Sequence, residues 1–274
     1  MDYLVEDLRT RIAQRRVVVI VGAGVSMAAA RGAEAAGWTG LLRSGVKRVK
    51  SVVPTVPSGW LERQTGALAD GDLEESLGVA EQIARKLKAP HGGEYRRWLR
   101  ESVGALRVEE RAAIDALIAL GAPLCTTNYD NLLEDCTGRP AVTWRDRDRC
   151  SRVLHGDEQG ILHLHGHWAQ PESIVFGIRS YEDALGDEYL QALLQALRMY
   201  KTLLFVGFGA GLQDPNFSAF LAWCGRVFPD AESRHFRLAR AQDVAALQAE
   251  HPPEQRLFVL SYGQEFSDLA AYLR

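Results

Sequence analysis

The stretch that most constrains the fold runs from Val17 to Ser26, where an apolar run meets a glycine-rich turn. The five consecutive β-branched residues from Val17 to Val21 are typical of a strand that is buried on both faces of a parallel sheet. Gly22 and Gly24 follow at once and permit a tight turn that side chains would block. The small residues after Ser26 favour a helix. A strand, a glycine turn and a helix N-terminus in this order can bind a phosphate group.

The turn departs from the standard phosphate-binding signatures. The third glycine of the dinucleotide fingerprint would fall at Met27, and residues 43–47 contain no acid to bind the ribose. The Lys-Ser/Thr pair of a nucleoside triphosphate loop is absent. Ala28 occupies the second glycine position of a hydrolase nucleophile elbow around Ser26. Taken alone, this stretch is compatible with a nucleotide site and equally with a structural strand–turn–helix connection.

The chain has 274 residues, enough for one large domain or for a domain with a subdomain. Its net charge of −3, without a long basic run, argues against a dedicated nucleic-acid-binding protein. No apolar run reaches the roughly 18 residues that a membrane span needs, and residues 1–6 do not resemble a signal peptide. The four cysteines are far apart, which predicts no zinc-binding pair and no disulfide framework and is typical of a cytoplasmic protein.

The hydrophobic pattern predicts an α/β fold with a doubly wound parallel Rossmann-like sheet, in a single domain over residues 1–274. A helix is expected at 2–14. Only helical patterns follow over about 37–120, which predicts a helical insertion lobe between the first two strands. Further strands are expected at 123–127, 161–166, 202–206, 235–238 and 256–260. We also expect a charged loop at 145–152, a short strand or turn at 173–177 and one helix at 181–200.

Several of these strands end in polar or glycine-rich residues, which a parallel sheet places at one edge. We therefore expect one crevice to contain glycines, a hydroxyl, an amide, carboxylates and an imidazole, namely Ser26, Asn128, Asp130, His165, Gly207, Gly209 and Asp214. These residue types suit a dinucleotide, because glycines admit phosphates while Asn and Asp bind ribose hydroxyls. The same residues also have structural interpretations: Asn128 and Asp130 as a turn, and Asp214 as a helix N-cap.

Three histidines alternate along the chain, at positions 163, 165 and 167. On one strand they would share a face, as in some metal sites, but Gly166 is expected to end the strand and turn His167 away. We expect His165 at the carboxyl end of the strand, where a substrate can approach. His163 is expected further back as a buried, hydrogen-bonded core residue, and His167 in contact with solvent. No further cluster completes a metal site, so we expect a metal-free protein.

Four short motifs, in this order, resemble the signatures of the sirtuin (silent information regulator) family: Gly-Ala-Gly-Val-Ser at 22–26, Thr-Thr-Asn-Tyr-Asp at 126–130, His-Leu-His-Gly at 163–166 and Gly-Phe-Gly-Ala-Gly-Leu-Gln-Asp at 207–214. The resemblance implies that Asn128 positions a water or the nicotinamide ribose, that Asp130 supports that site and that His165 is the catalytic base. It also implies that the first motif holds the pyrophosphate of NAD and the last motif the adenosine half. The residues implied in NAD binding are Gly22, Ala23, Gly24, Ser26, Thr127, Asp130, Gly207, Phe208, Gly209 and Asp214.

The chain departs from the protein-deacylating sirtuins in two places. Those enzymes carry two Cys-x-x-Cys zinc pairs after the His-Gly motif, where this chain has Trp168-Ala169-Gln170-Pro171, and their Pro-Asp-Phe-Arg element is missing here. We therefore expect no zinc module. The Thr-Thr-Asn-Tyr-Asp form and the Gly-Trp-x-x-Leu-Leu stretch at 37–42 are more similar to the sirtuin-like NAD-hydrolysing domains of bacterial antiphage defence.

The resemblance thus implies an NAD⁺ glycohydrolase that releases nicotinamide and ADP-ribose without a metal and depletes NAD during antiphage defence. Control by a homo-oligomer or by a sensor partner is expected, because such an activity must be held off until it is needed. Two alternatives stay open. One is an NAD-dependent protein deacylase or ADP-ribosyltransferase that uses the same core. The other is a non-catalytic module that senses NAD or ADP-ribose.

Overall fold

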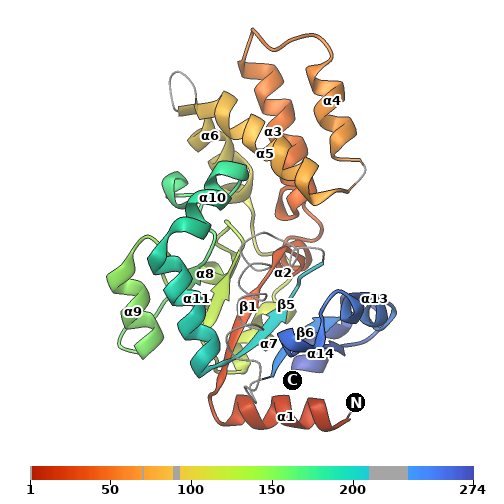
Figure 1. Cartoon of the computed structure of the whole chain (residues 1–274), viewed down its shortest axis with the longest axis vertical. Helices are drawn as coiled ribbons and strands as arrows, with labels where there is room; N and C mark the ends of the chain where they lie inside the picture. Colours follow the sequence, from red (N-terminus) through yellow and green to blue (C-terminus); the bar gives the residue numbers. More distant parts are fainter. Residues whose placement is uncertain (1, 70, 89–92, 210–233) are drawn as a thin grey trace.

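The computed structural model describes residues 2–69, 71–88, 93–209 and 234–274. Its strands form one sheet, of order β3-β4-β2-β1-β5-β6-β7, in which every paired neighbour is parallel (Figure 1). The chain winds outward from β1 in two directions, which is the predicted doubly wound Rossmann-like fold. The strands are β1 (Val17–Val21), β2 (Leu124–Thr126), β3 (Ala141–Thr143), β4 (Ile161–His163), β5 (Thr202–Val206), β6 (His235–Ala239) and β7 (Leu257–Ser261).

Helices connect the strands and surround the sheet (Figure 1). The α-helices are α1 (Asp2–Ala13), α2 (Ala23–Ala29), α3 (Trp38–Val52), α4 (Trp60–Ala67), α5 (Leu73–Lys88), α6 (Gly93–Glu101), α7 (Ala112–Ala119), α8 (Leu132–Thr137), α9 (Arg147–His155), α10 (Ile178–Gly186), α11 (Glu188–Tyr200), α13 (Val244–Ala249) and α14 (Asp268–Leu273). Short 3-10 turns are η1 (Glu34–Ala36), η2 (Val103–Ala105), η3 (Pro171–Ser173), η5 (Ala241–Asp243) and η6 (Pro253–Gln255).

The central strand β1 is buried on both of its faces, as its apolar sequence predicts. All five of its residues are buried. Val17, Val19 and Val21 belong to one hydrophobic cluster, while Val18 and Ile20 belong to a second. Because side chains alternate along a strand, the two clusters fill the two sides of the sheet. Because β1 is buried on both faces, it holds the turn that follows it in a fixed position relative to the sheet.

Helices α3 to α6 gather at the top of the view in Figure 1, on the side to which the carboxyl end of β1 points. Between β1 and β2 the described residues contain no strand, as predicted. Asp72 caps the N-terminus of α5, since Glu75 N donates to Asp72 Oδ1 at 2.9 Å. Gly45 lets α3 pack closely on its neighbours, because a Cβ atom there would lie 2.9 Å from Ile83 and 3.0 Å from Trp98.

Two sequence predictions for the second half of the chain were wrong, and one strand was missed. The charged stretch at 145–152 is largely helix α9, because Asp146 accepts from Arg149 N at 3.3 Å and the apolar side buries Cys150 and Val153. Edge strand β3 was not predicted. The single helix expected at 181–200 is two helices, since Asp187 ends α10 and its Oδ1 caps α11 by accepting from Leu190 N at 2.9 Å.

One further prediction fails at a strand end. Of the short strand or turn expected at 173–177, no strand forms; η3 ends at Ser173 and α10 begins at Ile178. Strand β4 ends at His163 and does not reach Gly166.

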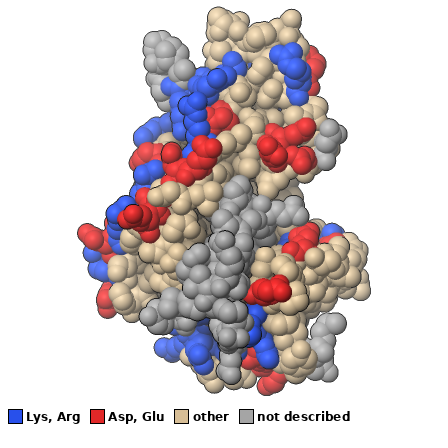
Figure 2. Space-filling model, viewed as in Figure 1, with Lys and Arg blue, Asp and Glu red and all other residues tan. Residues whose placement is uncertain are grey.

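The described surface mixes both signs of charge. In the face drawn in Figure 2, Lys and Arg side chains lie close to Asp and Glu side chains. Ion pairs account for part of this pattern, for example Arg48 with Glu94 at 2.7 Å and Arg149 with Glu158 at 2.6 Å. Among the described helices, none is long and apolar enough to cross a membrane.

Candidate functional site

The carboxyl ends of the central strands lie at one level. Val21 at the end of β1 pairs with Thr126 of β2 on one side and with Val206 of β5 on the other, and Thr126 pairs with His163 of β4. Strand β1 is also where the winding direction reverses, and open α/β sheets bind ligands at that point. The turns that follow β1, β2 and β5 therefore meet, as predicted.

The glycine turns after β1 and β5 pack directly on each other. Gly22 N donates to Val206 O at 2.9 Å, and Gly24 N donates to Gly207 O at 2.8 Å. A Cβ atom at Gly22 or Gly24 would lie 2.8 or 2.9 Å from the Gly207 carbonyl oxygen, and Gly207 has a φ of +77°. Side chains would therefore push the turns apart. The glycines are needed here for contact between the turns, a reason that the sequence did not reveal.

The remaining predicted residues of these turns lie around this contact. Ala23 is the first residue of α2. Phe208 is buried with its ring beside Gly22, and Gly209 is exposed. The fully buried side chain of Arg237, on β6, donates hydrogen bonds to the carbonyl oxygens of Phe208 and Gly209 and so supports the turn after β5. Asp214 lies outside the described residues.

Ser26, Asn128 and Asp130 form one buried hydrogen-bond network where the turns meet. Ser26 Oγ, on α2, donates to Asp130 Oδ2 at 2.8 Å. Asn128 Nδ2 donates to Ser26 Oγ at 2.8 Å and to Gly22 O at 3.1 Å. The network joins the first glycine turn to the turn after β2, so residues far apart in the sequence come together as predicted.

The backbone after β2 is fixed by two threonines. Thr126 Oγ1 donates to Val21 O at 2.9 Å and accepts from Asn128 N at 3.0 Å. Thr127 is half-buried, and its N donates to Val21 O at 3.1 Å. These bonds connect the end of β2 to the end of β1 and hold Asn128 beside the glycine turn.

Asn128 presents one acceptor without a partner. Its N, O and Nδ2 atoms all make hydrogen bonds, while Oδ1 makes none to any residue that the structure describes. An amide oxygen has two lone pairs and accepts readily from water or a hydroxyl. Asn128 is thus a rigidly held side chain with a free acceptor.

Asp130 is a buried carboxyl group inside the network. Burial raises its pKa, while the hydrogen bonds from Leu132 N, at 3.0 Å to Oδ1, and from Ser26 act in the opposite direction. The nearby Glu134 adds to the rise. Both of its oxygens are occupied by donors, so its geometry suits support of the neighbouring groups.

His163 is the buried, hydrogen-bonded core residue that the sequence predicts. Its Nδ1 lies 2.9 Å from Asn128 O and its Nε2 lies 2.7 Å from Glu134 Oε1 on α8. Burial lowers its pKa, but the hydrogen bond and charge of Glu134 outweigh this effect, and the pKa is raised overall.

His165 lies two residues beyond the end of β4, so its prediction as the last strand residue was wrong. Gly166, with a φ of +87°, turns the chain away directly after it. The buried His165 ring packs edge-on against Tyr181 of α10 at 5.7 Å, whereas the His163 ring contacts α8. The two rings therefore do not share one face as the alternation predicted.

His167 is buried, so the prediction that it faces solvent was wrong. Its Nε2 bonds to Asn131 Oδ1 at 2.9 Å, and its Nδ1 accepts from Ala169 N at 3.3 Å. The backbone N–H requires a lone pair on Nδ1, which fixes the neutral imidazole. Burial first, and then the charge of His163, lower the pKa of His167 to about 3.

Sequence reasoning missed the aromatic side chains that connect the helical segment to the Asn128 turn. The Phe176 ring packs on Trp38 of α3 at 5.2 Å, on Trp98 of α6 at 5.5 Å and on Tyr129 at 6.4 Å. Tyr129 also donates from its hydroxyl to Val175 O at 2.6 Å. No local pattern pairs these positions, because they meet only in the folded chain.

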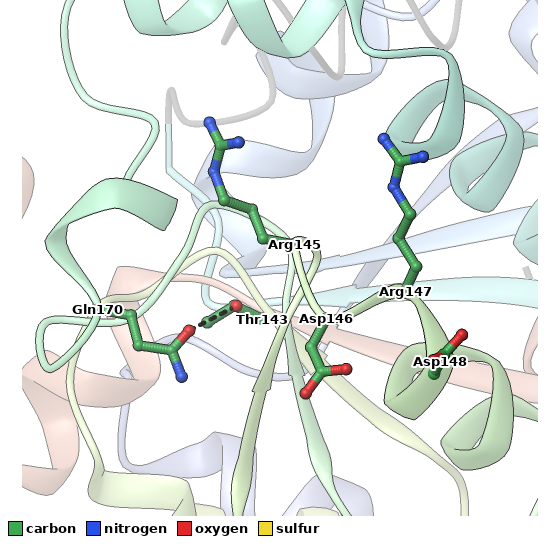
Figure 3. A pocket seen from close by; sticks show the side chains of 6 residues that line it. All are labelled: Thr143, Arg145, Asp146, Arg147, Asp148 and Gln170. Carbon is green, nitrogen blue, oxygen red and sulfur yellow. Dashed lines mark hydrogen bonds between the residues drawn. The ribbon is translucent and has the colours of Figure 1, made fainter.

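A pocket of about 500 Å³ lies at the carboxyl end of edge strand β3, and Figure 3 shows that its two arginines extend to one side while Asp146 points to the other. The lining residues are Thr143, Arg145, Asp146, Arg147, Asp148 and Gln170. Thr143 Oγ1 donates to Gln170 Oε1 at 2.8 Å across it. Of the sequence-predicted site residues that the structure describes, none lines this pocket.

Within the described ranges, no group of three or more His, Cys, Asp or Glu side chains is arranged to hold a metal ion. Residues 123–265 match the family of the SIR2-like domain. This match covers just over half of the chain and includes Asn128, Asp130 and His165. It indicates NAD-related chemistry and the binding or use of NAD.

Proposed function

The chain belongs to the SIR2-like domain family, and from that premise we propose that it is an NAD⁺ glycohydrolase, which cleaves NAD⁺ to nicotinamide and ADP-ribose. The observation that carries the proposal is the free Oδ1 acceptor of Asn128, held at the meeting point of the turns after β1, β2 and β5. This is the point at which a doubly wound sheet binds nucleotides.

The proposed reaction breaks the bond between the anomeric carbon of ribose and the nicotinamide nitrogen. The pyridinium takes the bonding electron pair and leaves as neutral nicotinamide. A water oxygen forms the new bond to the anomeric carbon, and its proton passes to a base and then to solvent. The protein must therefore position one water, stabilise the cationic ribose and accept one proton.

Two residues fit these tasks. Asn128 Oδ1 accepts a hydrogen bond from the attacking water or from a ribose hydroxyl. The hydrogen bonds that hold the Asn128 amide fix its orientation beforehand, so no free energy is lost in reorienting the amide during the reaction. His165 is the proposed base, because an imidazole exchanges protons near neutral pH. Asp130 and Ser26 keep the amide of Asn128 in place through the bonds described above.

We propose that the two packed glycine turns hold the dinucleotide. Gly22, Ala23 and Gly24 would approach the pyrophosphate, while Gly207, Phe208 and Gly209 would lie along the adenosine half, with Asp214 beyond the described residues. Thr127, half-buried beside Asn128, completes the set. The reaction needs no metal, so we expect turnover to be unchanged by a chelator such as EDTA.

The experiment is incubation of the purified protein with NAD⁺, alone and with an acetyl-lysine peptide or a protein acceptor. Hydrolysis predicts equal amounts of nicotinamide and ADP-ribose in every sample. Nicotinamide release only with the peptide, together with deacetylation, would identify a deacylase. Labelled ADP-ribose on the acceptor would identify a transferase, and binding without turnover a sensor.

We further propose that the activity depletes NAD during antiphage defence and is controlled by self-association or by a sensor partner. The support is the resemblance of residues 37–42 and 126–130 to NAD-hydrolysing defence domains. Cellular NAD in bacteria that express the chain should fall on phage infection and stay constant without phage. Light scattering during the same activation should reveal a change in mass.

A further inference from the structure

His163 and Glu134 form a buried pair directly behind Asn128 that takes no part in the proposed reaction. The His163 side chain is fully buried, and that of Glu134 is 12% exposed. Nδ1 of His163 lies 2.9 Å from the backbone carbonyl oxygen of Asn128, and its Nε2 lies 2.7 Å from Glu134 Oε1. A carbonyl oxygen only accepts hydrogen bonds, so Nδ1 must carry a proton and donate it.

We propose that His163, oriented by Glu134, is a positioning residue that holds the backbone of Asn128 and thereby aims its side-chain amide at the first glycine turn. This inference rests on the proposed function, which gives Asn128 its part in the reaction. His163 touches no reacting atom and acts only through Asn128.

The bond from His163 ties Asn128 itself to β4, a strand other than β1 and β2. Asn128 N donates to Thr126 of β2, and its Nδ2 donates to Gly22, directly after β1, and to Ser26 on α2. His163 comes from β4, on the far side of β2. Its bond fixes the carbonyl end of the residue, so the peptide plane cannot rotate. A displacement of about 1 Å at such a position can cost about 10²-fold in rate.

The groups around His163 favour donation from both ring nitrogens. Glu134 faces Nε2 from α8, and Asp130 contributes further negative charge from the turn after β2. His167 packs edge-on against the ring at 4.8 Å, and it stays neutral because Ala169 N donates to its Nδ1. The second oxygen of Glu134 is buried without a hydrogen-bond partner among the described residues. The bond to His163 is therefore the side-chain hydrogen bond that this carboxylate makes within the described chain.

Two variants separate positioning from simple packing. In His163→Asn the amide nitrogen takes the place of Nδ1 and keeps the bond to Asn128 O. In His163→Gln it takes the place of Nε2, which keeps the bond to Glu134 and loses that to Asn128. His155→Gln, at an exposed residue that ends α9, is the matched control. Melting temperatures confirm that the compared proteins are folded.

We expect His163→Gln to lower kcat for NAD⁺ by about 10²-fold, without a matching change in KM, because only the aim of Asn128 is lost. His163→Asn should retain most of the wild-type kcat. If His163 were merely structural, the two variants would lose melting temperature and folded fraction to the same extent. Equal loss of kcat in the two folded variants, or no loss in either, would overturn the proposal.

A second readout does not depend on turnover. The ¹⁵N spectrum of the wild-type protein should show both ring nitrogens of His163 protonated at neutral pH, and an unprotonated Nδ1 would refute the proposal even if no variant folds. The amide resonances of Asn128 should move in His163→Gln and stay in place in His163→Asn; unmoved resonances in His163→Gln refute it. If the wild type leaves NAD⁺ intact while these shifts appear, the proposed function fails and the positioning inference stands.

Discussion

Asn128 shows how a single side chain is specified by three separate elements. Thr126 at the end of β2, Ser26 on α2 and His163 at the end of β4 each make a hydrogen bond to it, and Gly22 O accepts another. Among the described residues, these four bonds leave one polar atom of Asn128, Oδ1, open to a ligand. The rigidity comes from neighbours at strand ends, whose positions are set by the buried sheet.

At the same scale, His167 should make folding sensitive to acid. Its folded pKa of about 3 lies below the value of about 6.5 expected in the unfolded chain, so the unfolded state binds the extra proton between these values. The free energy of unfolding therefore falls as the pH drops through this window, by up to about 1.4 kcal/mol per pH unit for one proton. His167→Gln, which keeps a donor toward Asn131, should show a shallower slope in urea titrations from pH 7 to 4. An unchanged slope would count against a buried neutral His167.

His165 should carry the proton transfer. His165→Gln is expected to lower NAD⁺ turnover by about 10²–10⁴-fold, the usual loss for a general base, while the exposed control His155→Gln leaves turnover unchanged. The measurement is nicotinamide release over time, with melting temperature to confirm folding. A folded His165→Gln protein with wild-type turnover would remove this residue from the mechanism.

At the scale of elements, the contact between the glycine turns after β1 and β5 is the most sensitive to added volume. Gly24→Ala places a methyl group 2.9 Å from Gly207 O, so we expect a loss of about 1–3 kcal/mol in the free energy of unfolding and weaker NAD⁺ binding. Gly78→Ala is the matched control, because a Cβ atom there meets nothing within 4 Å in the middle of α5. It should gain about 0.5–1 kcal/mol from helix propensity alone. Calorimetry measures NAD⁺ binding and denaturant titration measures stability. Equal effects of Gly24→Ala and Gly78→Ala in these measurements would contradict the packing of the turns.

The aromatic cluster around Phe176 should support the Asn128 turn from the helical segment. Phe176→Ala removes the ring that Trp38, Trp98 and Tyr129 share, and we expect a loss of about 3–5 kcal/mol in unfolding free energy. The control is Phe266→Ala, at a residue that is 59% exposed, where the loss of unfolding free energy should stay near 0.5 kcal/mol, roughly the limit for an exposed site. If denaturant titration gives the two variants similar stabilities, the cluster does not hold the turn.

The sequence predicted well those elements whose residues form a recognisable pattern within one short stretch of the chain. Residues 17–21 and 203–206 are uninterrupted apolar runs, and a glycine follows each. Strand β4 is different, because pairing with β2 and β3 ends at His163 while the apolar pattern continues through Leu164. Helix α9 was not predicted because its charged residues dominate the local pattern, and only Cys150 and Val153 of its nine residues are buried.

For the whole molecule, the sequence predicted the doubly wound sheet and the meeting of Ser26, Asn128 and Asp130, since parallel strands bring their carboxyl ends together. It could not predict the order of the strands, the burial of His167 or the pairing of His163 with Glu134. Each of these depends on contacts between segments that carry no shared pattern. The family match over residues 123–265 accords with the motif-based resemblance, and the catalytic assignment remains a prediction.

The central claim is that Asn128 organises NAD⁺ cleavage at the edge where the three turns meet, and nicotinamide release by wild type and Asn128→Ala tests it most directly. The two proteins are compared under the conditions that activate the wild type, with NAD⁺ binding measured by calorimetry and folding by melting temperature. We predict equal amounts of nicotinamide and ADP-ribose from the wild type, and a loss of about 10²-fold or more in Asn128→Ala that still folds and binds NAD⁺. A folded Asn128→Ala protein that releases nicotinamide at the wild-type rate would contradict the account.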